Sequence, residues 1–227
     1  EELQRTYTFD SDFRSDFDFT NLALFTQLDT ALTSQWNWST GLRIERRTAN
    51  YSDSRDVQFD PDETLWGGRL ALQYTPQAGQ MYYVSLSRGY KAGGFNTDGS
   101  LDADLREFSS ESLLELELGA KLNLMDDRLT LRGAVFYDQR RDQQVKSSLL
   151  RARPNGSTEF IDYLGNAAEG TNRGIELETQ WLALDTPTLY ANVGLLRSRI
   201  VDFFYDAVVA FACRAQYPAP LYTLHYI

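Results

Sequence analysis

The sequence has one cysteine, one histidine and six prolines in 227 residues, and it contains no long apolar run. The lone Cys213 excludes a disulfide within the chain, and the lone His225 excludes a metal site built from several histidines. A membrane-spanning helix needs about 20 consecutive apolar residues, so no such helix is expected. Transmembrane β-strands need only every second residue to be apolar, so this class of membrane protein remains open.

Basic charge is also scarce, because 22 lysines and arginines stand against 32 acidic residues and the net charge is -10. A nucleic-acid partner would require a basic face, so none is expected. We find no glycine-rich phosphate loop, no Ser/His/Asp set and no Cys/His cluster, and therefore expect neither an enzyme nor a cofactor or metal site. The chain opens on Glu1 and Glu2 rather than on an export leader, which for an exported protein indicates processing or truncation.

Tyrosine and phenylalanine are abundant, at 13 each, which favours strands. Eight segments alternate between apolar and polar side chains with a period of two residues. The clearest is 111–124, where Leu114, Leu116 and Leu118 face away from Glu115 and Glu117. The eight segments, which predict four hairpins, are 22–32, 36–48, 66–75, 80–88, 111–124, 128–141, 171–183 and 188–200.

Alternation is shared by membrane barrels and soluble β-sandwiches, but segment and loop lengths favour a barrel. The segments run for about 9–14 residues, whereas strands of soluble proteins average about 5–6. Short turns and long polar loops follow one another in strict alternation, as in outer-membrane barrels. The long loops are expected at 49–65, 89–110 and 145–170, and the short turns near 33–35, 76–79, 125–127 and 184–187.

Aromatic residues on the apolar side of these segments gather near the segment ends. The short-turn ends carry Trp36, Trp38, Tyr74, Tyr82 and Trp181, and the long-loop ends carry Trp66 and Tyr137. This resembles the two aromatic girdles that border the apolar band of a membrane barrel. The sequence therefore predicts an all-β protein, a piece of an antiparallel transmembrane β-barrel with about eight complete strands.

Two motifs carry a resemblance to a known family. Residues 87–96 read S-R-G-Y-K-A-G-G-F-N, and residues 166–178 read N-A-A-E-G-T-N-R-G-I-E-L-E. Both resemble motifs in the barrels of TonB-dependent outer-membrane receptors, and the likeness extends over about 20–200. It implies that 1–227 is part of a 22-stranded barrel whose plug domain is not in this sequence.

The resemblance also implies a function, a location and partners. Receptors of this family lie in the outer membrane of Gram-negative bacteria and import scarce solutes, mostly ferric siderophores. The implied partners are such an iron chelate, the lipid and lipopolysaccharide of the outer membrane, and the TonB protein, which would act on the missing N-terminal region. The ligand itself cannot be read from the sequence.

The glycine-rich motif has two interpretations. Its glycines at 89–94 could let the chain leave a strand through positive φ angles, so that the motif is a structural element of the barrel rim. Alternatively, the loop lines the extracellular vestibule and binds the ligand. The candidate ligand-binding residues are Arg88, Tyr90, Lys91, Phe95 and Asn96.

Acidic residues form two further groups without a clear chemical role. Paired glutamates at 115 and 117, and at 176 and 178, point to one side of a strand and are interpreted as charges facing water or the plug. The loop at 49–65 carries several carboxylates that could bind Ca²⁺ but lack the spacing of a calcium loop. We interpret them as a solvated loop; they are Asp53, Asp56, Asp60, Asp62 and Glu63.

Other functions remain open beside the receptor. A complete small barrel with an anchoring or adhesive role would end in a closing aromatic strand, whereas this chain ends on Ile227. A passive porin, an outer-membrane hydrolase and a soluble carbohydrate-binding sandwich are further alternatives. Residues 219–223 resemble the start of another strand, and 202–218 have no assigned role, so truncation before barrel closure is expected.

Overall fold

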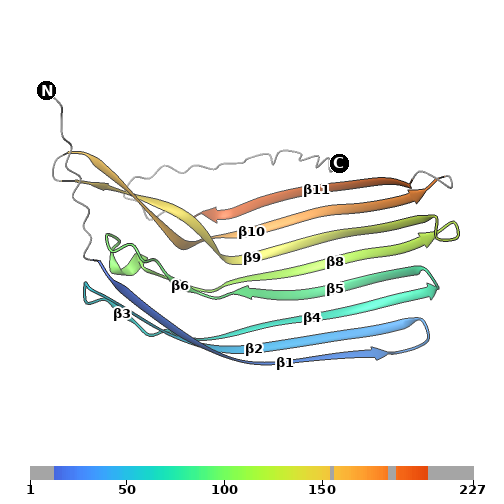
Figure 1. The fold of residues 1–227 in the computed structure, drawn as a ribbon, viewed down its shortest axis with the longest axis horizontal. Helices are drawn as coiled ribbons and strands as arrows, with labels where there is room; N and C mark the ends of the chain where they lie inside the picture. Colours follow the sequence, from blue (N-terminus) through green and yellow to red (C-terminus); the bar gives the residue numbers. More distant parts are fainter. Residues whose placement is uncertain (1–12, 154–155, 184–187, 204–227) are drawn as a thin grey trace.

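The computed structural model describes residues 13–153, 156–183 and 188–203, and it shows one long, twisted, open antiparallel sheet (Figure 1). Each strand of its main path pairs with the next one along the chain, as in a meander. The eight strands of this path are β1 (Ser15–Ala31), β2 (Trp36–Asp53), β4 (Asp62–Gln77), β5 (Gln80–Lys91), β8 (Glu111–Leu124), β9 (Leu129–Ala152), β10 (Thr158–Leu182) and β11 (Thr188–Phe203). The eight predicted segments and their four hairpins are thus confirmed.

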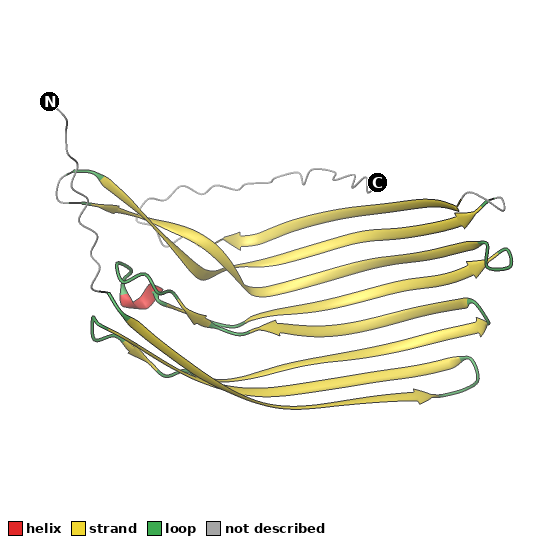
Figure 2. Ribbon diagram, viewed as in Figure 1, coloured by secondary structure: helices red, strands yellow, loops and turns green. Residues whose placement is uncertain are grey.

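The remaining elements lie at one end of this sheet (Figure 2). The short strand β3 (Gln58–Phe59) pairs with β2. A separate two-stranded sheet consists of β6 (Gly94–Phe95) and β7 (Glu107–Phe108), with the 3-10 helix η1 (Ala103–Leu105) between them. In the part of the chain that the structure describes, no helix is long and apolar enough to cross a membrane.

The two faces of the sheet differ in chemistry, because side chains alternate along each paired strand. One hydrogen-bonded row, on the side we call the apolar face, consists of Trp38, Leu72, Val84, Leu118, Val135, Ile175 and Leu195. A row on the opposite side, which we call the polar face, consists of Arg69, Ser87, Glu115, Asp138, Asn172 and Ser198. The register therefore confirms the predicted separation of apolar and polar side chains.

The apolar side chains of the sheet are exposed and some of its polar side chains are buried, which is the reverse of a soluble protein. Leu118 and Ile175 on the apolar face are each 51% exposed, whereas Glu45 on the polar face is 7% exposed. A soluble sandwich would bury its apolar face against a second sheet. A sheet with an exposed apolar face and partly buried polar groups on the other side is the arrangement of a membrane barrel.

The short turns that the structure describes lie at one end of the sheet, on the right in Figure 1, which we call the turn end. Between β8 and β9, Met125, Asp126 and Asp127 adopt positive φ angles of 56°, 54° and 63°. Between β4 and β5, Gly79 has a φ of 77°. The turns predicted at 33–35, 76–79 and 125–127 are confirmed, and the one at 184–187 lies outside the described residues.

Aromatic residues border the apolar face as expected. At the turn end, the rings of Trp36 and Tyr74 stack with centroids 4.6 Å apart, and Tyr82 is the partner of Tyr74 on the next strand. At the opposite end, which we call the loop end, Trp66 lies on the same face. Large aromatic rings at both borders of an apolar band are typical of positions near lipid headgroups.

The prediction of a long polar loop at 145–170 is wrong. β9 and β10 continue as a paired hairpin with a connection between Ala152 and Thr158, and they span 24 and 25 residues. A tilted transmembrane strand needs about 9–11 residues, so this hairpin projects well beyond an apolar band. Its outer half lacks apolar alternation because it contacts water and other loops rather than lipid, which explains the misreading of its pattern.

The other two long connections are shorter than predicted. β2 extends to Asp53 and β4 begins at Asp62, so the loop predicted at 49–65 shrinks to 54–61 and contains β3. β5 extends to Lys91 and β8 begins at Glu111, which leaves a connection that we call loop 92–110. Both lie at the loop end, together with the projecting hairpin (Figure 1).

Candidate functional site

Loop 92–110 folds against the polar face at the loop end, and a buried ion pair holds it there. The guanidinium of Arg106 contacts the carboxylate of Asp53 at the end of β2, and their side chains are only 4% and 0% exposed. Arg106 also donates hydrogen bonds to the carbonyl oxygens of Gly99 at 3.0 Å and Leu101 at 3.2 Å. The hydroxyl of Tyr51 donates to Asp53 at 3.1 Å, so both charges are well satisfied.

Two asparagines fasten the same loop to the projecting hairpin. Asn96 Nδ2 donates to the carbonyl of Leu164 at 2.8 Å, and the N–H of Leu164 donates back to Asn96 Oδ1 at 2.8 Å. Asn166 forms a matching pair with Ser109, accepting from its N–H at 2.6 Å and donating to its carbonyl at 2.9 Å. Asn96 from the first motif and Asn166 from the second therefore both tie loop 92–110 to the hairpin, although 68 residues separate Asn96 from Leu164.

A group of four aromatic rings lies beneath the loop. Phe95 stacks on Tyr51 with centroids 5.0 Å apart and on Phe59 at 5.6 Å, and it meets Phe17 edge-on at 5.4 Å. Offset-stacked and edge-to-face pairs of this kind are each worth about 0.5–1.5 kcal/mol beyond their buried area. Phe95 thus anchors β6 to β1, β2 and β3, besides any role in binding a ligand.

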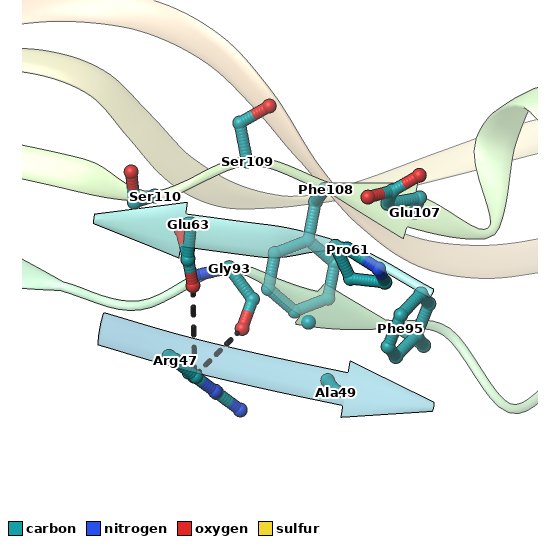
Figure 3. Close-up of a pocket in the computed structure, with 11 residues that line it drawn as sticks. Arg47, Ala49, Pro61, Glu63, Gly93, Phe95, Glu107, Phe108, Ser109 and Ser110 are labelled. Carbon is teal, nitrogen blue, oxygen red and sulfur yellow. Dashed lines mark hydrogen bonds and ion pairs between the residues drawn. The ribbon is translucent and has the colours of Figure 1, made fainter. Parts of the chain in front are cut away.

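A cavity of about 250 Å³ opens between the polar face and the loop (Figure 3). Arg47 from β2 and Glu63 from β4 lie 4.0 Å apart on one wall, and Arg47 donates to the carbonyl of Gly93 at 3.1 Å. The other wall comes from the loop and contributes the rings of Phe95 and Phe108 with the hydroxyl of Ser109. The cavity therefore combines a cation, carboxylates, hydroxyls and aromatic surface.

Tyr90 belongs to a second polar group on the same side. Its hydroxyl donates to Glu45 Oε2 at 2.9 Å and accepts from Arg43 Nε at 3.0 Å, while Arg43 Nη2 lies 2.5 Å from the same carboxylate oxygen. The ring passes close to Gly67, since a Cβ at that position would lie 3.3 Å from Tyr90 Cε1. Tyr90 therefore orders charged residues of the polar face.

The structure does not bring all five predicted ligand-binding residues together. Tyr90 lies over the polar face, Phe95 lines the cavity, and Asn96 is fully engaged in holding the loop. Lys91 is exposed at the end of β5. Arg88 lies on the apolar face, where its guanidinium sits 4.1 Å from the centroid of the Trp66 ring, so it is separated from the other four.

The expected reason for the glycines at 89–94 is also wrong. Among the described residues, positive φ angles at glycine occur at Gly79 and Gly156 and not in this motif. The motif instead needs glycine because another segment of the backbone lies too close to leave room for a Cβ atom. A Cβ on Gly93 would lie 2.6 Å from the carbonyl oxygen of Phe108, whereas a Cβ on Gly89 would meet nothing within 4 Å.

Replacing Gly93 with alanine should therefore displace β6 from β7 and destabilise loop 92–110. We expect a cost of about 1–3 kcal/mol, the usual penalty of overpacking, because the obstructing atom belongs to the backbone. Gly89→Ala is the matched control and should cost far less. Hydrogen exchange of loop 92–110 in the full-length protein measures the effect, and equal protection in the two variants would contradict this role of Gly93.

The acidic residues take different roles. Asp53 is buried in its ion pair with Arg106, so the expectation of a solvated loop is wrong for this residue. Asp62 pairs with Arg46 at 2.5 Å and Glu63 with Arg47, so neither belongs to an open carboxylate cluster. Across the described residues, no group of three or more histidine, cysteine or acidic side chains is placed to hold a metal ion. Glu115 lies on the polar face, as predicted.

Several residues of this site were missed in the sequence. Arg47 was placed only on the polar side of segment 36–48, and Glu63 was interpreted as part of a solvated acidic loop, so neither was assigned to this cavity. Arg106 and Ser109 carried no local signal, because their partners come from distant segments, and Asn166 was recognised as part of the second motif but without a contact assigned to it. A search for polar side chains near the loop end of neighbouring strands would have found Arg47 and Glu63 but not the other residues.

The comparison with known proteins agrees with this geometry. Residues 3–213 match the family model described as TonB dependent receptor-like, beta-barrel. The pesticin receptor of Yersinia pestis is 26% identical over 169 residues, which cover 70% of this chain and 23% of that receptor. The pesticin receptor of Yersinia enterocolitica is 27% identical over the same length and coverage. The chain thus spans about a quarter of these curated relatives.

Solved structures share the fold. The crystal structure of the ferric yersiniabactin uptake receptor FyuA from Yersinia pestis superposes with a TM-score of 0.66 and 23% identity, covering 83% of this chain and 28% of that one. The siderophore receptor PiuA from Acinetobacter baumannii has a TM-score of 0.60 and 18% identity, covering 85% of this chain and 27% of that one.

Proposed function

The chain belongs to the family of TonB-dependent receptor-like β-barrels, and on this basis we propose that the whole protein is an outer-membrane receptor and importer. Its cargo is a scarce solute, with a ferric siderophore or similar iron chelate as the first choice. Uptake is driven by the TonB protein acting on parts of the receptor beyond this chain. The apolar face contacts the lipid of the outer membrane, and the polar face lines the barrel interior.

The observation that carries this proposal is the cavity at the loop end. It lies over the polar face, and its walls place Arg47, which is paired with Glu63, beside the rings of Phe95 and Phe108, with Glu107 as a second carboxylate. The aromatic arms of a chelate would stack on these rings, and one of its anionic groups would compete with Glu63 for Arg47 through charge-assisted hydrogen bonds. Two related proteins bear names that motivate the choice of an iron chelate: FyuA is a ferric yersiniabactin receptor and PiuA is a siderophore receptor.

Ligand contacts are proposed for Tyr90 and Lys91, which lie next to each other where β5 leaves the sheet. Lys91 presents an exposed ammonium group, and Tyr90 presents a ring whose hydroxyl is already fixed by Glu45. Phe95 contributes one wall of the cavity, while Asn96 only positions the loop. We propose no ligand contact for Arg88, because it lies on the apolar face beside Trp66.

The test is binding of a panel of labelled ferric siderophores, starting with ferric yersiniabactin, by the full-length receptor. Tyr90→Ala and Lys91→Ala should each weaken binding by about 1–3 kcal/mol, the usual cost of losing a hydrogen bond to a charged group. Arg88→Ala, from the opposite face of the same strand, is the matched control and should bind normally. Unchanged affinity in the first two variants, with normal surface expression, would leave the glycine-rich motif as a structural rim element.

A further inference from the structure

Internal ion pairs balance the charge at the loop end of the polar face. Arg47, on the wall of the cavity, lies 4.0 Å from Glu63 and donates to the carbonyl of Gly93 at 3.1 Å. Its guanidinium also lies 5.0 Å from the centroid of the Phe19 ring. Other arginines around the loop are paired in the same way: Arg43 with Glu45, Arg106 with Asp53, Arg140 with Glu111 and Arg151 with Asp102. An anionic ligand would therefore have to compete with a carboxylate for each of these cations.

Loop 92–110 adds a second carboxylate to the cavity, that of Glu107 (Figure 3). Glu107 is exposed, and within the described residues it takes part in no ion pair. It is the direct partner of Phe95 in the sheet formed by β6 and β7. Side chains of direct partners leave a sheet on the same face, with Cβ atoms about 4.5–5.5 Å apart. An aromatic arm that stacks on Phe95 thus comes close to the carboxylate of Glu107.

The cavity therefore has a net negative charge. Its lining carries one cation, Arg47, against two carboxylates, Glu63 and Glu107. Lys91, at the end of β5, adds one exposed ammonium group to the loop end. A buried anion needs a compensating cation, and like charges brought together at a binding surface are strongly disfavoured. This wall can compensate a single negative charge on a ligand, but not several.

We propose that Glu63 and Glu107 select the cargo by its charge. The receptor accepts iron chelates that are neutral or carry a single negative charge, and the two carboxylates repel chelates that carry several. Repulsion of the wrong ligand is an established route to specificity. This inference rests on the proposed function and specifies which class of iron chelate the cavity takes.

The distinction separates two chemical classes of ferric chelate. In a trihydroxamate chelate, three singly charged hydroxamates balance the charge of the ferric ion, so the complex is neutral. In a tris-catecholate chelate, each catecholate contributes two negative charges, so the complex is multiply anionic. The charge of the cavity fits the first class and opposes the second.

The experiment measures binding by the full-length receptor in detergent, through quenching of its tryptophan fluorescence. The panel of ferric siderophores includes ferrichrome as a trihydroxamate and ferric enterobactin as a tris-catecholate. The wild type should bind ferric enterobactin at least about tenfold more weakly than the best ligand of the panel, and added salt should strengthen this weak binding by screening the repulsion. Glu107→Gln should raise the affinity for ferric enterobactin about threefold, and Glu63→Gln/Glu107→Gln about tenfold or more, without changing the affinity for ferrichrome.

Asp104→Asn is the matched control, because it removes an exposed carboxylate of the same loop that does not line the cavity. It should leave the affinity for both chelates unchanged, and an equal gain in this variant would assign the effect to overall charge and overturn the proposal. Ferric enterobactin as the best ligand, or an unchanged affinity for it in the double variant, would also overturn the selection by charge while leaving the function as an importer intact. Failure to bind any ferric chelate would overturn the proposed function and this inference with it.

Discussion

Replacing Arg106 with alanine should release loop 92–110 from the sheet. The change leaves the carboxylate of Asp53, whose side chain is 0% exposed, as a buried charge without its cation. Removing one partner of a buried ion pair typically costs about 3–5 kcal/mol, because the remaining charge keeps its desolvation penalty. The carbonyl groups of Gly99 and Leu101 also lose their donor. We expect local opening rather than loss of the barrel, since these contacts lie outside the paired rows of the main sheet.

Hydrogen exchange of the full-length protein measures this effect, as faster exchange in 92–110 and at residues 54–57. Arg153→Ala is the matched control, because it breaks an exposed ion pair with Glu159 at 2.7 Å, which is worth at most about 1 kcal/mol. The double variant Arg106→Met/Asp53→Leu should recover part of the stability by removing both charges. Unchanged protection of the loop in Arg106→Ala would show that the asparagine contacts alone hold it.

Placing arginine at Leu118 should destabilise the barrel by about 2–4 kcal/mol, the cost of a basic side chain near the middle of the bilayer. Leu118 lies on the apolar face between Val84 and Val135 and is 51% exposed on the isolated sheet, so the arginine would enter lipid. Urea titration of the full-length protein in lipid vesicles gives the change in the free energy of unfolding.

Glu117→Arg is the control, because Glu117 is the adjacent residue on the polar face, opposite Ser85. That substitution keeps a charged side chain in a polar environment and should change stability much less than Leu118→Arg. Equal losses in the free energy of unfolding for the two variants would contradict the assignment of the apolar face to lipid and the polar face to the barrel interior. The comparison does not depend on the proposed ligand.

The family and its barrel architecture follow from local patterns. Alternation along 111–124 already separates Leu118 from Glu117, and the register of β8 with its neighbours confirms that separation. The reason is geometric, because a paired strand sends successive side chains to opposite faces whatever its partners are. For the same reason the aromatic border at Trp36 and Tyr74 could be placed before its stacking contact was known.

The site is determined only by the tertiary structure. Alternation along β5 would place Tyr90 on the same face as Arg88, but the pairing of β5 with β4 ends at Arg88 while its pairing with β8 continues to Lys91. The sequence therefore could not show that Tyr90 reaches Glu45 while Arg88 covers Trp66. Arg106 finds Asp53 at a separation of 53 residues, too far apart for any local pattern to connect them.

The outer half of the β9–β10 hairpin was misread for a related reason. Its faces contact water and loops, as where Arg151 reaches Asp102 at 3.0 Å, so apolar residues no longer mark every second position. Lipid imposes a pattern that can be read along the strand, whereas contacts between loops depend on which distant segments the folded barrel brings together. The sequence by itself therefore determined the strands and their two faces, and the tertiary structure alone decided which loop residues anchor the cavity and which remain exposed.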